Sequence, residues 1–171
     1  LALVTIVAQD IMRGLLLRQD VSPDTWLHVI LAALAHDIGY VRGVCRGDQD
    51  GHCIISVDGR MVELPRGASD AFLAPYHVER SKICVRERFA DHDLVDPERL
   101  ASNIELTRFP VPDDDDHAAT DTEAAFVRAA DLIGQLGDPL YPRKLNALFH
   151  EFAETGMNAT LGYTTPADLA D

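Results

Sequence analysis

The chain has 171 residues and 47% apolar composition, which is enough to bury the core of a single domain over residues 1–171. Its net charge of −13 argues against a surface that coats nucleic acid, although its 15 Lys and Arg residues can still converge on a small anion. The apolar start, Leu1–Ala8, is too short to span a bilayer and lacks signal-peptide features. Three Cys residues without framework spacing are typical of free thiols, so we expect a cytoplasmic protein without a membrane partner.

Two helices are expected at the start of the chain. Apolar residues recur at helical spacing up to about Leu17. Ser22-Pro23-Asp24 then supplies a capping hydroxyl, an early Pro and an acid, which together favour a helix start. This second helix runs to His36-Asp37, where Gly39 can end it. Because it is apolar over most of its surface, we expect it to lie at the centre of a helical bundle.

A small β-hairpin is expected as an insertion at about residues 52–65. Cys53–Val57 and Arg60–Leu64 have the composition of short strands, and Asp58-Gly59 between them predicts a two-residue turn. A packing flap is the favoured role for such a hairpin, and a lid or specificity loop is the alternative.

The rest of the chain predicts four further helices, and hence an all-α fold with a small hairpin. Their starts have Pro75, Asp96-Pro97, the capping box Thr120-Asp-Thr-Glu123 and Pro142, and the last three end near Phe109-Pro110, Gly137 and Gly156. They are expected at residues 75–89, 96–108, 120–137 and 142–155. The acidic run Asp113–Asp116 predicts a solvated loop, and the tail from Asn158 to Asp171 is expected to be irregular and peripheral.

His36-Asp37 is the strongest candidate for chemistry. The pair ends an apolar run, where ionisable side chains are costly unless they are paired or bound to metal. A neutral imidazole and a carboxylate are common ligands of divalent ions. Asp131 likewise lies within a helical stretch between apolar neighbours, and Asp is rarely buried without a partner. The alternatives are an accidental dipeptide with a capping Asp and a residue on a polar helix face.

Residues 31–39, Leu-Ala-Ala-Leu-Ala-His-Asp-Ile-Gly, resemble the second motif of the HD superfamily of metal-dependent phosphohydrolases. Residues 129–133, around Asp131, resemble its final motif, and the resemblance extends over roughly residues 1–150. It implies an HD-domain-like helical bundle in which His36, Asp37 and Asp131 are metal ligands. His77 resembles the extra ligand of the two-metal branches, and the resemblance makes Asp37 and His77 the catalytic candidates.

The implied activity is hydrolysis of a nucleotide-type phosphoester by a metal-activated water. The implied cofactor is one or two divalent ions, with Mn, Fe, Co, Ni or Zn better suited to these ligands than Mg. Arg80 lies one helical turn after His77, so the two could form a ligand and a phosphate clamp. Arg42 and Arg108 are further candidates for substrate binding. For His77 the alternative is a structural histidine on a surface face, and for the arginines it is solvation.

Two departures from the HD pattern leave a second function open. Tyr40 stands where many members have a Lys, and the first His of the ligand set is absent, since His28 is eight residues before His36 and off its face. We expect that His upstream of residue 1, in an N-terminal part of the domain that precedes this sequence. The alternatives are a non-catalytic HD-like module that binds a nucleotide or a protein, and a helical interaction domain without metal. A homodimer is compatible with the sequence, but no residue pattern demonstrates one.

Overall fold

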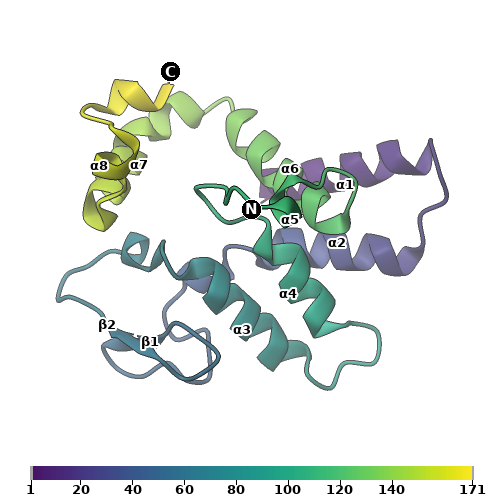
Figure 1. Cartoon of the computed structure of the whole chain (residues 1–171), viewed down its shortest axis with the longest axis horizontal. Coiled ribbons are helices and arrows are strands. Elements are labelled where there is room, and N and C mark those ends of the chain that lie inside the picture. The colour runs from purple at the N-terminus through teal and green to yellow at the C-terminus, as the bar shows by residue number, and fades with distance from the viewer. Residues whose placement is uncertain (1, 171) are drawn as a thin grey trace.

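Helices make up most of the structure, which confirms the all-α prediction with its small hairpin (Figure 1). The computed structural model describes residues 2–170. None of the helices in this range is long and apolar enough to cross a membrane. The α-helices are α1 (Ala2–Leu16), α2 (Pro23–Ala35), α3 (His77–Phe89), α4 (Pro97–Glu105), α5 (Asp115–Ala118), α6 (Glu123–Leu136), α7 (Tyr141–Thr155) and α8 (Met157–Leu161). Short 3₁₀ helices are η1 (Ile38–Tyr40), η2 (Asp70–Leu73) and η3 (Pro166–Ala170).

The apolar helix α2 lies at the centre of the bundle, as its composition predicts. It packs against α1, α4 and α6. Val29, Ala32 and Ala33 are fully buried in this core. The small alanine side chains allow the neighbouring helices to approach α2 closely, and each fully buried Val or Leu contributes about 1.5–3 kcal/mol relative to an exposed one. The end of α2 is therefore held rigidly by the core.

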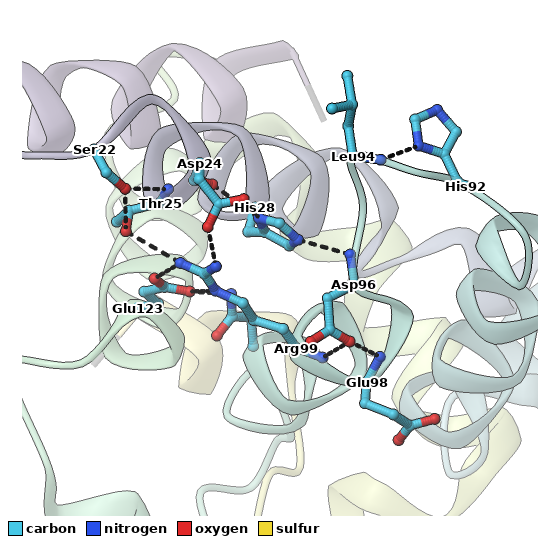
Figure 2. Close-up of polar contacts among 11 residues, drawn as sticks. Ser22, Asp24, Thr25, His28, His92, Leu94, Asp96, Glu98, Arg99 and Glu123 are labelled. Atoms are coloured by element: carbon cyan, nitrogen blue, oxygen red, sulfur yellow. Dashed lines mark hydrogen bonds and ion pairs between the residues drawn. The ribbon is translucent and has the colours of Figure 1, made fainter.

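The helix starts agree with the capping signals in the sequence. Ser22 Oγ accepts a hydrogen bond from Thr25 N at 3.0 Å, and Asp96 Oδ1 accepts one from Glu98 N at 2.9 Å (Figure 2). The start of α6 is capped by Thr122. Because a capping side chain satisfies an amide that the helix itself leaves unpaired, these residues determine where α2, α4 and α6 begin.

A partly buried polar seam joins α2 to α4 and α6. His28 Nε2 accepts a hydrogen bond from Asp96 N at 2.9 Å, and its Nδ1 lies 2.8 Å from the Asp24 carbonyl oxygen. Arg99 pairs with Asp24 and with Glu123, whose Oε2 lies 2.9 Å from Nε (Figure 2). His28 is therefore a structural residue, in agreement with its spacing from His36.

The hairpin forms where it is expected, but its turn differs from the prediction. Strand β1 (His52–Ile54) pairs antiparallel with β2 (Met61–Glu63). The predicted two-residue turn is wrong: Ile55 N donates to the Arg60 carbonyl at 2.8 Å, so the four residues 56–59 connect the strands, and Gly59 N donates to the Ser56 carbonyl within them. The Asp58 carboxylate accepts from the Ser56 hydroxyl, which favours this wider turn over a tight one.

Three other boundaries differ from the expectations. The acidic run is not only a loop, because α5 begins at Asp115 and the Asp114 side chain caps it by accepting from His117 N at 2.9 Å. The fourth helix ends at Glu105 rather than near residue 108. The tail is not irregular, since it forms α8 and η3. Elements this short carry too few residues to show a helical period, so the sequence pattern cannot reveal them.

Candidate metal centre and adjoining cavities

The dipeptide His36-Asp37 lies in the turn between α2 and η1 rather than within a helix. His36 closes α2, and its backbone N–H donates to the Ala32 carbonyl at 2.9 Å. Asp37 has a backbone conformation near φ −98° and ψ 1°, outside the regular helical values. The turn carries both side chains out of the core helix while α2 keeps their backbone fixed.

Helix α3 clamps this turn from the other side. Ser81 Oγ donates to the His36 carbonyl at 2.6 Å and accepts from Gly39 N at 2.9 Å. Arg80 Nε donates to the Gly39 carbonyl at 2.7 Å. A Cβ atom on residue 39 would lie only 1.9 Å from the His77 carbonyl oxygen, so the close approach requires glycine.

The imidazole of His36 is buried, with 1% of the residue exposed. Its Nδ1 lies 2.9 Å from the Ala33 carbonyl oxygen, which can only accept, so Nδ1 carries a proton. The other nitrogen, Nε2, lies 3.2 Å from Asp37 Oδ2 and 3.3 Å from Asp131 Oδ1. Asp131 comes from the middle of α6, so the fold brings together two motifs that are distant in the sequence.

The two carboxylates create a strong preference for positive charge at Nε2. Burial alone would lower the pKa of His36, but the interactions with Asp131 and Asp37 outweigh it and raise this pKa to about 10. Neither contact has hydrogen-bond geometry, and Nε2 has no other partner among the described residues. The attraction is therefore that of charges around one point rather than of directed hydrogen bonds.

The surroundings of Asp37 and Asp131 keep both side chains in place. Burial disfavours the charge on Asp37, but the adjacent positive charge of His36 lowers its pKa below the ordinary value. Gln135, one turn after Asp131 on α6, donates to Asp131 Oδ1 at 2.8 Å. This second contact fixes the orientation of the carboxylate that faces His36.

The two distances from His36 Nε2 to the carboxylates agree with those between donor atoms that share one metal ion. Donor atoms bound to one transition metal at about 2.0–2.2 Å lie about 3.0–3.4 Å from each other, which matches both separations from His36 Nε2. No three His, Cys, Asp or Glu side chains within residues 2–170 form a completed ligand cluster. An unpaired buried nitrogen beside two carboxylates nevertheless has the donor chemistry that a divalent cation requires.

His77 lies near this group but makes no direct contact with it. Its Nδ1 is 2.6 Å from the Ala74 carbonyl oxygen, and its ring stacks on Tyr40 with centroids 4.4 Å apart. Burial lowers the pKa of His77, so the ring is neutral near neutral pH and Nε2 is its basic nitrogen. Tyr40 thus supports this histidine by stacking, and burial raises the pKa of its phenol.

Two cavities meet at the carboxylates, because Asp37 and Asp131 line both. The Lys144 cavity, about 360 Å³, lies between α7 and the start of α1, where Leu3 and Val4 line it. The Phe152 cavity, about 370 Å³, is lined by residues of the 106–111 segment after α4, by residues of α6 and α7, by His77, and by Tyr163 and Leu169 from the tail. The prediction of a peripheral tail is therefore wrong, since the tail forms part of a wall beside the candidate site.

Arg80 is not a substrate contact, and that prediction is wrong. The residue is 0% exposed, and its guanidinium donates to Asp48 at 2.8 Å and to the carbonyls of Gly39, Val41 and Ile54. With these donors occupied inside the protein, it cannot bind a phosphate. It instead joins α3 to the hairpin and to the turn after His36. These contacts favour the packing flap over a lid or specificity loop as the role of the hairpin.

The other two predicted arginines have different locations. Arg42 binds Asp70, with 2.9 Å between Nε and Oδ1, and lines a pocket beside the hairpin instead of either cavity at Asp37. Its predicted role as a substrate contact is therefore not supported by its position. Arg108 does line the Phe152 cavity, where it also pairs with Glu105 and Glu79.

Two residues that line the site were not predicted from the sequence. Arg128 and Gln135 lie one turn before and one turn after Asp131 on α6, and both line the Phe152 cavity. Arg128 Nη2 donates to the Ala119 carbonyl at 3.0 Å. Helical spacing from Asp131 was the signal that could have identified them.

The geometry defines an all-α protein with a His–Asp–Asp group, in which His36 and Asp131 are buried, at the junction of two cavities. The family model described as Npun_R2479-like matches residues 1–171, so the chain belongs to this family. No curated protein and no solved structure matches the chain.

Proposed function

We propose that this protein is an HD-like, metal-dependent phosphohydrolase. The single observation that carries the proposal is the position of His36 Nε2 between Asp37 Oδ2, at 3.2 Å, and Asp131 Oδ1, at 3.3 Å. Two acidic groups around an unpaired imidazole nitrogen, beside a cavity, supply ligands for a cation and space for a substrate. The identity of residues 36, 37 and 131 and their HD-like motifs agree with this arrangement.

In the proposal, His36, Asp37 and Asp131 hold the metal, and His77 is an additional ligand or a phosphate contact. A bound divalent ion would supply Lewis acidity and an acidified water. The transition metals Mn, Fe, Co, Ni and Zn suit these ligands better than Mg does. A first His upstream of residue 1 remains a prediction; the start of α1 lies beside the carboxylates, because Leu3 and Val4 line the Lys144 cavity with them.

The remaining roles belong to side chains around the Phe152 cavity. Asp37, 38% of whose side chain is exposed, can accept a hydrogen bond from an attacking water and orient it. His77, with Nδ1 engaged by Ala74, can use Nε2 to bind the water or the phosphate. Arg108 and Arg128 place positive charge at the cavity wall, which favours a phosphate and the charge that develops during its transfer.

Elemental analysis of the purified protein tests the proposal, with Asp131→Ala and Asp138→Ala analysed beside the wild type. Asp138 also lines the Lys144 cavity but pairs with Lys144 instead of His36, so it controls for a general loss of negative charge. We expect about one or two equivalents of transition metal in the wild type and in Asp138→Ala, with loss in Asp131→Ala. Equal metal content in all three proteins, or no metal after loading, would contradict the site.

A second candidate function is a non-catalytic HD-like binding module. The observation that favours it is the lack of a completed three-ligand cluster among residues 2–170. In that case the proton on His36 Nε2 is the permanent counter-charge of the two carboxylates. A protein that binds a phosphoester without metal and without turnover would favour this function over the phosphohydrolase.

As part of the main proposal, the protein is cytoplasmic and acts on a small phosphorylated molecule. The HD resemblance implies a nucleotide-type phosphoester. A homodimer stays a prediction, which sedimentation equilibrium of the purified protein would test.

A further inference from the structure

The Phe152 cavity has an apolar wall in addition to the carboxylates of Asp37 and Asp131. Its polar end contains Asp37, His77 and Arg108. Its apolar side chains come from the segment that follows α4, from α6, from α7 and from the tail. They are Leu106, Phe109, Val111, Leu132, Leu136, Leu148, Phe152 and Leu169. Phe109 and Phe152 lie nearly parallel, with ring centroids 6.4 Å apart.

Three of the polar side chains that line this cavity, Thr107, Gln135 and Arg128, are already hydrogen-bonded within the protein. Thr107 Oγ1 donates to the Ile104 carbonyl at 2.8 Å, and Gln135 Nε2 donates to Asp131 at 2.8 Å. Arg128 uses both terminal nitrogens on backbone carbonyls of the 117–119 segment. A nucleoside needs partners for its sugar hydroxyls and base edge, and unpaired polar groups in a cavity lose about 1–3 kcal/mol each. These three side chains therefore offer a nucleoside few free partners, whereas the apolar side chains of the cavity can bury an apolar group.

Resting on the proposed function, we propose that the substrate is a phosphate monoester of an apolar alcohol or phenol. The phosphate lies at the polar end near Asp37, His77 and Arg108, and the apolar group lies against Leu132 and Phe152. A cavity of about 370 Å³ is at the small end of ligand sites and suits a group of one or two rings or a short alkyl chain.

The reaction is balanced by water alone. The water oxygen forms a new bond to phosphorus, and the bond between phosphorus and the ester oxygen breaks. The electron pair of that bond stays on the ester oxygen, which leaves as the alcohol after taking a proton that originates from the water. The products are the apolar alcohol and inorganic phosphate, and no oxidant or reductant is needed.

Binding rather than turnover tests the substrate class, by isothermal titration calorimetry on the full chain. The probes are 1-naphthyl phosphate, inorganic phosphate and adenosine monophosphate. We expect 1-naphthyl phosphate to bind at least about tenfold more tightly than either of the others, because only its ring can bury apolar surface on the wall. Tighter binding of adenosine monophosphate would overturn the proposal.

Two neighbouring residues of α6 provide a matched pair of variants. Leu132 lines the cavity and is 41% exposed, whereas Ile133 is 52% exposed and lines neither cavity at the carboxylates. Leu132→Ala should weaken binding of 1-naphthyl phosphate about fivefold or more, and Ile133→Ala should leave it unchanged. Equal effects of the two variants would overturn the placement of the ligand. Phe152→Leu and Phe149→Leu form a second pair on α7, with the effect expected only for Phe152.

The test separates the substrate class from the proposed function. If adenosine monophosphate binds best and is hydrolysed with metal, the phosphohydrolase stands and the apolar class is wrong. If 1-naphthyl phosphate binds in a Leu132-dependent way but no phosphoester is hydrolysed in the metal-loaded protein, the ligand class stands and the phosphohydrolase is wrong.

Discussion

Gly39 determines how closely the turn after His36 approaches α3. A Cβ atom at this position would lie 1.9 Å from a backbone oxygen of His77, and backbone cannot move aside as a flexible side chain can. The contact therefore links the position of the candidate metal ligand to the position of His77, through a residue that has no chemistry of its own.

We predict that Gly39→Ala lowers the free energy of unfolding by about 1–3 kcal/mol, the usual cost of overpacking. Gly14→Ala is the control, because nothing lies within 4 Å of its added Cβ inside α1. That variant should gain up to about 1 kcal/mol from helix propensity. Urea denaturation measures both. Unchanged stability of Gly39→Ala would mean that the turn and α3 are not in this contact.

At the residue scale, the sequence could predict identities but not partners. His36, Asp37 and Asp131 were identified from motif and setting, and the fold brings them together. The prediction that Arg80 contacts the substrate was wrong, because helical spacing shows which residues share a face of α3 but not whether that face is buried. Asp48, which neutralises Arg80, lies in a loop without regular pattern, so nothing in the sequence indicated the pair.

Helix α7 is attached to the molecule more weakly than the core helices. None of its residues, all of which the structure describes, is buried. Its contacts are with η2, α8 and η3, and it lies at the edge of the bundle beyond α6 (Figure 1). Glu154 anchors it by accepting from Ser69 N at 2.9 Å and from Ser69 Oγ at 2.6 Å. An amphipathic helix with so little burial depends on such local contacts.

We predict that Glu154→Ala speeds amide hydrogen exchange throughout α7 by roughly tenfold and leaves α2 unchanged. Glu151→Ala is the control on the same helix, because Glu151 is exposed and does not contact Ser69. Exchange read by mass spectrometry locates the effect. Protection of α7 equal to that of α2 in the wild type would show that the helix does not open separately.

At the element scale, start and end signals were most reliable where one residue determines the local geometry. Ser22, Asp96 and Gly156 each mark a helix boundary that the structure confirms. The sequence near residue 120 correctly predicted a capped helix start but placed it two residues too early, because Thr122 and not Thr120 accepts the capping hydrogen bond. The tail was missed because α8 and η3 are single turns between loops.

The whole molecule has many more acidic than basic groups, and its paired carboxyls decide how it responds to acid. Burial disfavours the charge on Asp48, but hydrogen bonds from Arg80 lower its pKa below the ordinary value. Glu105 and Glu123 follow the same pattern, with pKa values lowered by Arg108 and Arg99. A carboxyl with a lowered pKa in the folded state stabilises the fold above its unfolded pKa and loses this contribution as the pH falls through its folded pKa.

We therefore predict that the free energy of unfolding decreases as the pH falls from about 5 to about 3. Acid also relieves the repulsion of a net charge of −13, which opposes this trend. The paired carboxyls should dominate, since repulsion between exposed charges is screened beyond about 8 Å at physiological salt. Urea titrations at a series of pH values measure the slope. Rising stability in acid would show that charge repulsion is the larger effect.

Asp37 and Asp131 line both cavities, so two separate spaces in the protein adjoin the same pair of carboxylates. A molecule that fills the space beside Phe152 leaves the space beside Lys144 open. In the proposed phosphohydrolase, this second space would be the route by which water reaches the two carboxylates while a bulky ligand occupies the first.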